Sequence, residues 1–215
     1  MKRIILLMLG LFLTVSIMPV QAQKEVKKSK KELQKRSLKT ARKEARRLKR
    51  KGYFVAPGAL PIDKQLEKAY IKQAMEDENG YPKYIVASGN GVAGTQTAAK
   101  IQAMETAKLS LAGNLTTNVA SLIQSDVANK QLTREEAATV TKIISASKNI
   151  IAQELGRVIP LTELYKNVGK ENIQCDVQLA YDNKTAMEIA KKVIREQLEE
   201  QGLELQKKLD EMRGY

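Results

Sequence analysis

Apolar residues follow two spacings along the chain, and each spacing predicts a different kind of element. Apolar residues recur every three or four positions, as in amphipathic helices, through 98–122, 140–155 and 186–198. Through 172–181 they alternate with polar residues, so this segment is expected to be a strand with one buried face. A second strand is expected over 157–165, where Pro160 favours an edge position or a bulge. Together the two strands predict a hairpin.

Capping residues mark where several of these elements begin. Asp63 is placed to cap a helix over residues 64–75, and Thr133 and Glu136 have the spacing of a capping box. Residues 81–88 are expected to form a further strand. The order along the chain is then α-β-α-α-β-β-α. This order predicts an α+β fold in which long helices pack on a small, mostly antiparallel sheet.

A strongly cationic segment precedes this near-neutral body. Residues 24–51 contain 15 Lys or Arg and 3 Glu, whereas residues 52–215 contain 20 basic and 21 acidic groups. The segment has no Pro or Gly, and its apolar residues include a stripe at helical spacing formed by Leu38, Ala41, Ala45 and Leu48. We expect either a solvated basic tail or a cationic helix that folds on an anionic surface, held mainly by salt-sensitive electrostatic attraction.

The first residues of the chain have the pattern of a secretory signal peptide. Lys2 and Arg3 precede an uncharged run over 4–17, Pro19 follows, and cleavage is expected near Ala22. A membrane anchor is less consistent with this run, because spanning a bilayer takes about 20 apolar residues. The predicted organisation is a signal peptide over 1–22, a basic arm over 23–55, a linker over 56–62 and an α+β body over 63–215. The mature protein is expected in the periplasm or peripherally on the cell envelope.

The residue inventory excludes most familiar catalytic devices. The chain has no histidine and a single cysteine, so an imidazole base, a histidine metal site and a thiolate cluster are all ruled out. Cys175 lies on the apolar face of a predicted strand and is expected to be a small buried residue. Glu135-Glu136 and Glu199-Glu200 are adjacent on predicted helices and do not face each other. We therefore predict no catalytic residues, no cofactor and no metal.

Two sequence features suggest a dinucleotide or a nucleic acid as ligand, and the residues around each feature argue against it. Residues 89–94 read GNGVAG, which matches the glycine fingerprint of dinucleotide-binding folds. That fingerprint needs a second strand within about 30 residues, and the helical pattern instead continues past Leu115, so we expect a glycine turn. Nucleic acid is also an unlikely partner, because residues 24–51 contain no aromatic side chain on which a base could stack.

The body resembles a known family in the order and character of its segments. The segments are AAKIQAMETAKLSLAGNLTTNV (98–119), SASKNIIAQELG (145–156), IQCDVQLAYD (173–182) and TAMEIAKKVIREQLE (185–199). Over about residues 81–200 this pattern resembles the bacterial twenty-kilodalton surface lipoprotein family and its secreted relatives. The resemblance implies an α+β envelope domain without known catalytic residues. The chain departs from the family in lacking a lipidated cysteine after the signal, and its basic arm could replace the lipid in attachment.

These observations predict an exported, non-enzymatic cell-envelope protein. Its body would bind a partner protein, and its arm would attach to phospholipid head groups, lipopolysaccharide phosphates or an acidic glycan. The residues expected to contact that anionic surface are Lys27, Lys28, Lys30, Lys31, Arg42, Lys43, Arg46, Arg47, Lys49 and Arg50. In one alternative the arm packs on the acidic C-terminal helix, within one chain or across a homo-oligomer. Its carboxylates there would be Glu196, Glu199, Glu200, Glu204, Asp210 and Glu211. A more remote alternative is a carboxylate-dependent hydrolase.

Overall fold

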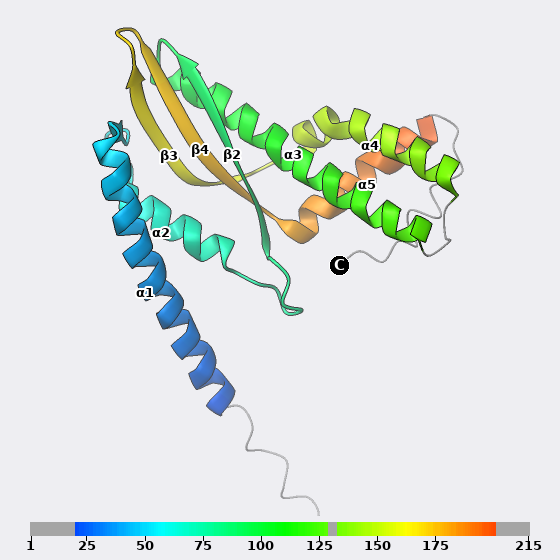
Figure 1. Cartoon of the computed structure of the whole chain (residues 1–215), viewed down its shortest axis with the longest axis horizontal. Coiled ribbons are helices and arrows are strands. Elements are labelled where there is room, and N and C mark those ends of the chain that lie inside the picture. The colour runs from blue at the N-terminus through cyan, green and yellow to red at the C-terminus, as the bar shows by residue number, and fades with distance from the viewer. Residues whose placement is uncertain (1–19, 129–132, 201–215) are drawn as a thin grey trace, which may run out of the picture.

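The protein has an α+β architecture in which helices cover both faces of a four-stranded antiparallel sheet (Figure 1). The computed structural model describes residues 20–128 and 133–200. Its elements are α1 (Val20–Arg50), β1 (Tyr53–Phe54), α2 (Ile62–Gln73), β2 (Tyr84–Ala93), α3 (Gln96–Ala128), α4 (Arg134–Glu154), β3 (Ile159–Val168), β4 (Asn172–Asp182) and α5 (Asn183–Glu200). The predicted fold class and element order are confirmed, and β1 is an addition. Most of the predicted signal peptide lies outside the described residues.

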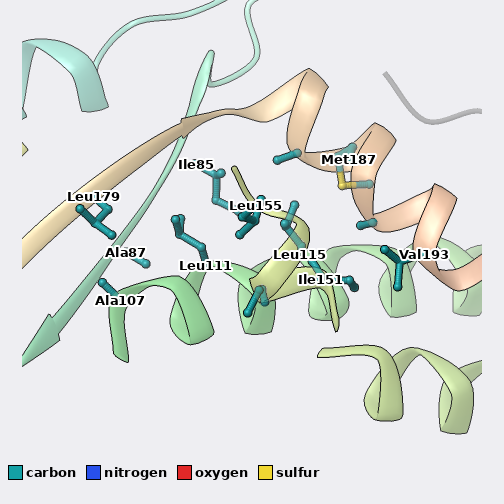
Figure 2. Close-up of a cluster of buried hydrophobic side chains, with 14 of the residues drawn as sticks. Ile85, Ala87, Ala107, Leu111, Leu115, Ile151, Leu155, Leu179, Met187 and Val193 are labelled. Carbon is teal, nitrogen blue, oxygen red and sulfur yellow. The ribbon is translucent and has the colours of Figure 1, made fainter. Parts of the chain in front are cut away.

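The main core lies between one face of the sheet and α3. Alternate residues of β4 point into it, and among them Cys175 and Leu179 are fully buried. The same core continues along α3 into the helices α4 and α5, where Leu115, Ile151 and Val193 meet (Figure 2). This arrangement follows from the two spacings in the sequence, because the period of two places one face of β4 on the helical stripe of α3.

The opposite face of the sheet is covered by α2. Ala69 of α2 packs against Leu161 and Ala180 of the sheet, and all three are buried. The predicted cap residue Asp63 lies inside the first turn of α2 rather than before it, because the helix begins at Ile62 after Pro61. Helix α1 lies on α2, outermost on this side of the molecule (Figure 1).

Two glycines of the GNGVAG segment belong to a strand and not to a turn. The strand predicted to end at Ser88 continues to Ala93, and Gly89 and Gly91 lie inside it on the face toward α3. A Cβ added at Gly89 would lie 2.2 Å from the carbonyl oxygen of Ala103, so the helix backbone rests directly on the strand there. Our prediction of a glycine turn was wrong, because these glycines allow a helix to approach closely.

The strand β3 contains the bulge that Pro160 favoured. Pairing with β4 is irregular between Pro160 and Thr162. Beyond the bulge, the side chain of Gln65 accepts a hydrogen bond from the backbone N–H of Glu163 at 2.7 Å and donates one to the carbonyl of Leu60 at 2.8 Å. The buried Gln65 thereby satisfies one backbone group of β3 and one of the loop before α2. It also ties α2 to the sheet.

Candidate functional site

The second half of α1 is docked on the body and is not a free arm. Ala41 is fully buried, and Ser37 and Ala45 are nearly so. Ala45 packs with Ile62 of α2 and Leu164 of β3, and Leu48 packs against the same cluster. The helix ends where Gly52 adopts a positive φ of 84°. Ala41, Ala45 and Leu48 of the predicted apolar stripe therefore face the body and are not available for insertion into a membrane.

This docking also shows which helix the arm packs on within one chain. The described contacts of α1 are mainly with α2, together with β1 and Leu164 of β3, whereas α5 lies with α3 and α4 on the far side of the sheet (Figure 1). Within one chain, packing of the arm on Glu196, Glu199 and Glu200 of α5 is therefore not the arrangement found. Glu204, Asp210 and Glu211 lie outside the described residues.

The outward side of α1 is a continuous cationic surface. Lys39, Lys43, Arg46 and Arg50 are spaced by four, three and four residues, so they follow one line along the helix, opposite Ala41. We call these four residues the cationic ridge. It extends about 16 Å along the helix axis, at a rise of roughly 1.5 Å per residue. In the described part of the chain, none of the four forms an ion pair with a carboxylate.

The structure places the predicted surface-binding residues in two groups. Six have exposed side chains, namely Arg42, Lys43, Arg46, Arg47, Lys49 and Arg50. Four lie in the first half of α1, which projects past α2 (Figure 1), and their side chains are outside the described residues: Lys27, Lys28, Lys30 and Lys31. Sequence reasoning missed Lys35, Arg36 and Lys39, which are also exposed. Their position off the side of the helix that carries Ala41 and Ala45 would have identified them.

One basic residue of α1 is neutralised locally. The Nε of Arg47 donates to Oε1 of Glu44 at 3.1 Å, and this hydrogen bond raises the pKa of the arginine. Glu44 is the only carboxylate between residues 35 and 51, which contain ten Lys or Arg. The remaining positive charges of this stretch are therefore spread over an exposed helix surface with little internal compensation.

A small polar cluster joins β1 to β4 on the side of the sheet that α2 partly covers. The hydroxyl of Tyr53 donates to Oδ2 of Asp176 at 2.6 Å, and Nε2 of Gln174 donates to Oδ1 at 2.8 Å. Nζ of Lys166 lies 5.7 Å from the centre of the Tyr53 ring. Both oxygens of Asp176 are thus occupied by neighbours. The cluster fixes the short strand β1 at the sheet edge.

We expect the Tyr53 cluster to stabilise the fold only below strongly alkaline pH. The hydrogen bond to Asp176 raises the pKa of Tyr53 from 10.0 to about 12. A pKa raised by folding gives stability that is complete below the unfolded value near 10 and is lost as pH rises through the folded value near 12. Tyr53→Phe should therefore remove one tyrosinate transition near pH 12 in an ultraviolet absorbance titration. Loss of a transition near pH 10 instead would contradict the hydrogen bond.

A hollow of about 440 Å³ with polar and apolar lining lies beside this cluster. Its lining includes Leu66, Ser88, Asn90, Thr106, Asp176 and Gln178. Ser88 and Asn90 belong to β2, which is the last strand on its side of the sheet. The lining offers hydroxyl and amide groups, and its single carboxylate is already bonded to Tyr53. This surface is suited to hydrogen bonding with an uncharged ligand.

The groups with catalytic potential in the core are held in structural contacts. Cys175 is fully buried, and burial raises the pKa of its thiol to about 11, so it is protonated at neutral pH. This confirms the expectation of a small buried residue. The hydroxyl of Tyr165 donates to Glu163 at 2.7 Å, and Nζ of Lys100 pairs with the same carboxylate at 2.8 Å. Among the described residues no group of three or more Asp, Glu, His or Cys could hold a metal ion.

Within residues 20–128 and 133–200, no helix combines the length and the apolar character that a membrane span requires. No protein family, curated protein or solved structure matches the chain. The resemblance to the twenty-kilodalton surface lipoprotein family therefore stays a prediction from segment order.

Proposed function

We propose that this chain is an exported, non-enzymatic protein of the cell envelope that attaches to an anionic surface through α1 and binds a partner through its body. The proposal of attachment rests on how the surface of α1 is divided. Ala41 and Ala45 of its apolar stripe are buried against the body, and the cationic ridge faces outward without ion-pair partners in the described residues. Export is supported by the signal-peptide pattern of residues 1–22.

Attachment through α1 would be electrostatic. Ala41 and Ala45 are buried in the body, so these residues of the docked half of α1 are not free to enter the lipid chains. Each Lys or Arg near an anionic surface contributes up to about 1 kcal/mol, and salt screens this attraction over roughly 10 Å at 0.1 M. The anion could be a lipid head group, a lipopolysaccharide phosphate or an acidic glycan, since a row of point charges suits each of them.

The absence of enzymatic activity is part of the proposal. It is supported by the burial and hydrogen bonding of the side chains that could otherwise act in catalysis. The only thiol is buried and protonated, and the chain has no histidine. The carboxylates of Glu163 and Asp176 each accept a hydrogen bond from a tyrosine. Neither is therefore poised as a general base beside an open nucleophile.

Reversing the cationic ridge is expected to abolish attachment. The variant would carry Lys39→Glu, Lys43→Glu, Arg46→Glu and Arg50→Glu in the full chain. Loss of four contacts and the new repulsion should lower binding at least about a hundredfold at low salt, from the contribution of each basic residue. Purified protein would be sedimented with isolated envelope membranes at low and high salt. Pure anionic phospholipid vesicles, lipopolysaccharide and acidic glycan, tested separately, would identify which surface is bound.

The control carries the same change of net charge on the body. Arg134→Glu, Lys142→Glu, Lys170→Glu and Lys184→Glu alter exposed side chains that form no described ion pair. This variant should bind almost as the wild type does, and both variants should keep their helical circular dichroism. Equal binding of the two variants, or wild-type binding that does not respond to salt, would overturn attachment through α1.

A further inference from the structure

The middle of the outer edge of β2 pairs with no other strand. Among the described residues it is the only long strand edge whose backbone groups lack partners. In an antiparallel pair the N–H and C=O groups of one residue point to the same side. The N–H of Val92 bonds Oε1 of Gln102 on α3 at 3.2 Å, outside the β2–β4 pair, so alternate residues back from Val92 also point outward. Among these, Val86, Ser88 and Asn90 make no described backbone hydrogen bond on that side.

This edge lacks the features by which proteins usually prevent pairing with another chain. Such features are charged side chains, proline, bulges and very short strands. Residues 84–93 read YIVASGNGVA and contain none of them over ten residues. The opposite edge is protected: β1 has two residues, and β3 carries a bulge beside Pro160 and a hydrogen bond from the backbone N–H of Glu163 to Gln65. The contrast marks the β2 edge as a surface for pairing.

We propose that the β2 edge binds an extended segment of a partner polypeptide, which adds a fifth strand to the sheet beside Val86, Ser88 and Asn90. Backbone hydrogen bonds would provide affinity, as in other cases of strand addition. Alternate side chains of the segment would face the hollow, whose polar groups include Ser88, Asn90 and Gln178. Both oxygens of its single carboxylate, Asp176, already accept hydrogen bonds from Tyr53 and Gln174, so uncharged, hydrogen-bonding side chains fit it. This inference rests on the proposed role of the body as a binding module and is independent of α1.

A second copy of this chain does not fit the edge in the same way. The backbone of α3 lies directly over Gly89 and Gly91. If two β2 strands paired, their spacing of about 4.8 Å would bring the two α3 helices closer together than the roughly 10 Å that helix diameters require. A single extended segment carries no such helix. The edge therefore suits a partner strand and disfavours a homodimer.

The inference is tested by selecting short random peptides, displayed on phage, for binding to the full chain. Selected peptides, made synthetically, should slow hydrogen exchange at the amides of Val86, Ser88 and Asn90, as followed by nuclear magnetic resonance. Ser88→Pro removes one outward N–H and is tolerable on an edge strand, and it should weaken binding at least about tenfold. Ser88→Ala keeps the N–H and removes only the hydroxyl at the hollow, so it should weaken binding clearly less than Ser88→Pro does.

The control measurements separate this inference from the proposal for α1. The charge-reversed ridge variant should bind the selected peptides as the wild type does, because the two surfaces do not overlap. Selection that yields no binding peptide would overturn the inference. Protection confined to other amides in wild-type protein would do the same, whether or not Ser88→Pro folds.

Discussion

Replacing Gly89 by alanine is expected to lower the free energy of unfolding by about 3 kcal/mol or more, at the upper end for an added methyl group. The new Cβ would lie 2.2 Å from the carbonyl oxygen of Ala103 and 2.3 Å from the backbone nitrogen of Ala107. Both atoms belong to the backbone of α3, so neither can rotate aside. Helix and strand must separate, which loosens the core between them. Urea unfolding followed by circular dichroism would measure the loss.

The matched control for Gly89→Ala is Gly94→Ala. A Cβ at Gly94 would have its nearest neighbour, the carbonyl oxygen of Glu171, at 3.8 Å, which is an ordinary contact. This variant should change stability by no more than about 0.5 kcal/mol. In Gly89→Ala, the further change Ala103→Gly should restore little, because the clash is with backbone atoms. Similar stability of the two single variants would show that α3 does not rest on β2 as described.

The elements that the sequence predicted well are those with a long, unbroken period. Helix α3 repeats its apolar residues over many turns, and β4 alternates cleanly, so local spacing was sufficient. The capping box of α4 was equally local: Thr133 and Glu136 form both expected hydrogen bonds. In each of these cases the signal lies within the segment itself.

The features that sequence analysis missed depend on distant parts of the chain. Gly89 and Gly91 look like turn residues until a helix backbone is placed against them. β1 is too short to show a period, and it exists only because Tyr53 and Phe54 pair with residues 165–166 of β3. A short segment cannot show which distant surface will cover it.

The candidate site shows the same division. Local spacing identified the stripe of Ala41 and Ala45, but it could not show that α2 covers this stripe. Once that contact is known, helix geometry shows which of residues 35–50 point away from the body. More than half of the residues of this segment are basic. The contact of Ala41 and Ala45 with the body shows that those of the cationic ridge point away from it. Packing inside the molecule defines the surface outside it.

Leu111→Ala tests the packing of α3 side chains against the sheet, and it should cost about 2–5 kcal/mol of unfolding free energy. Leu111 is fully buried in the cluster that α3 shares with Ile85 and Leu179 of the sheet (Figure 2). Truncation removes apolar burial and leaves a cavity that the rigid surroundings fill only in part. The lower end of the range would indicate that α3 moves toward the sheet to close the space, which the close contact at Gly89 restricts. Chemical unfolding would measure the cost.

Leu109→Ala provides a control of the same residue type on the same helix. Leu109 is 39% exposed, two residues before Leu111, and alanine has at least an equal helix propensity. The change should therefore alter stability by less than about 1 kcal/mol. A large difference between the two leucines would establish which side of α3 faces the sheet. If Leu109→Ala were the more damaging variant, the helix would be rotated relative to this fold, and Gly89 and Gly91 would no longer need to be glycine.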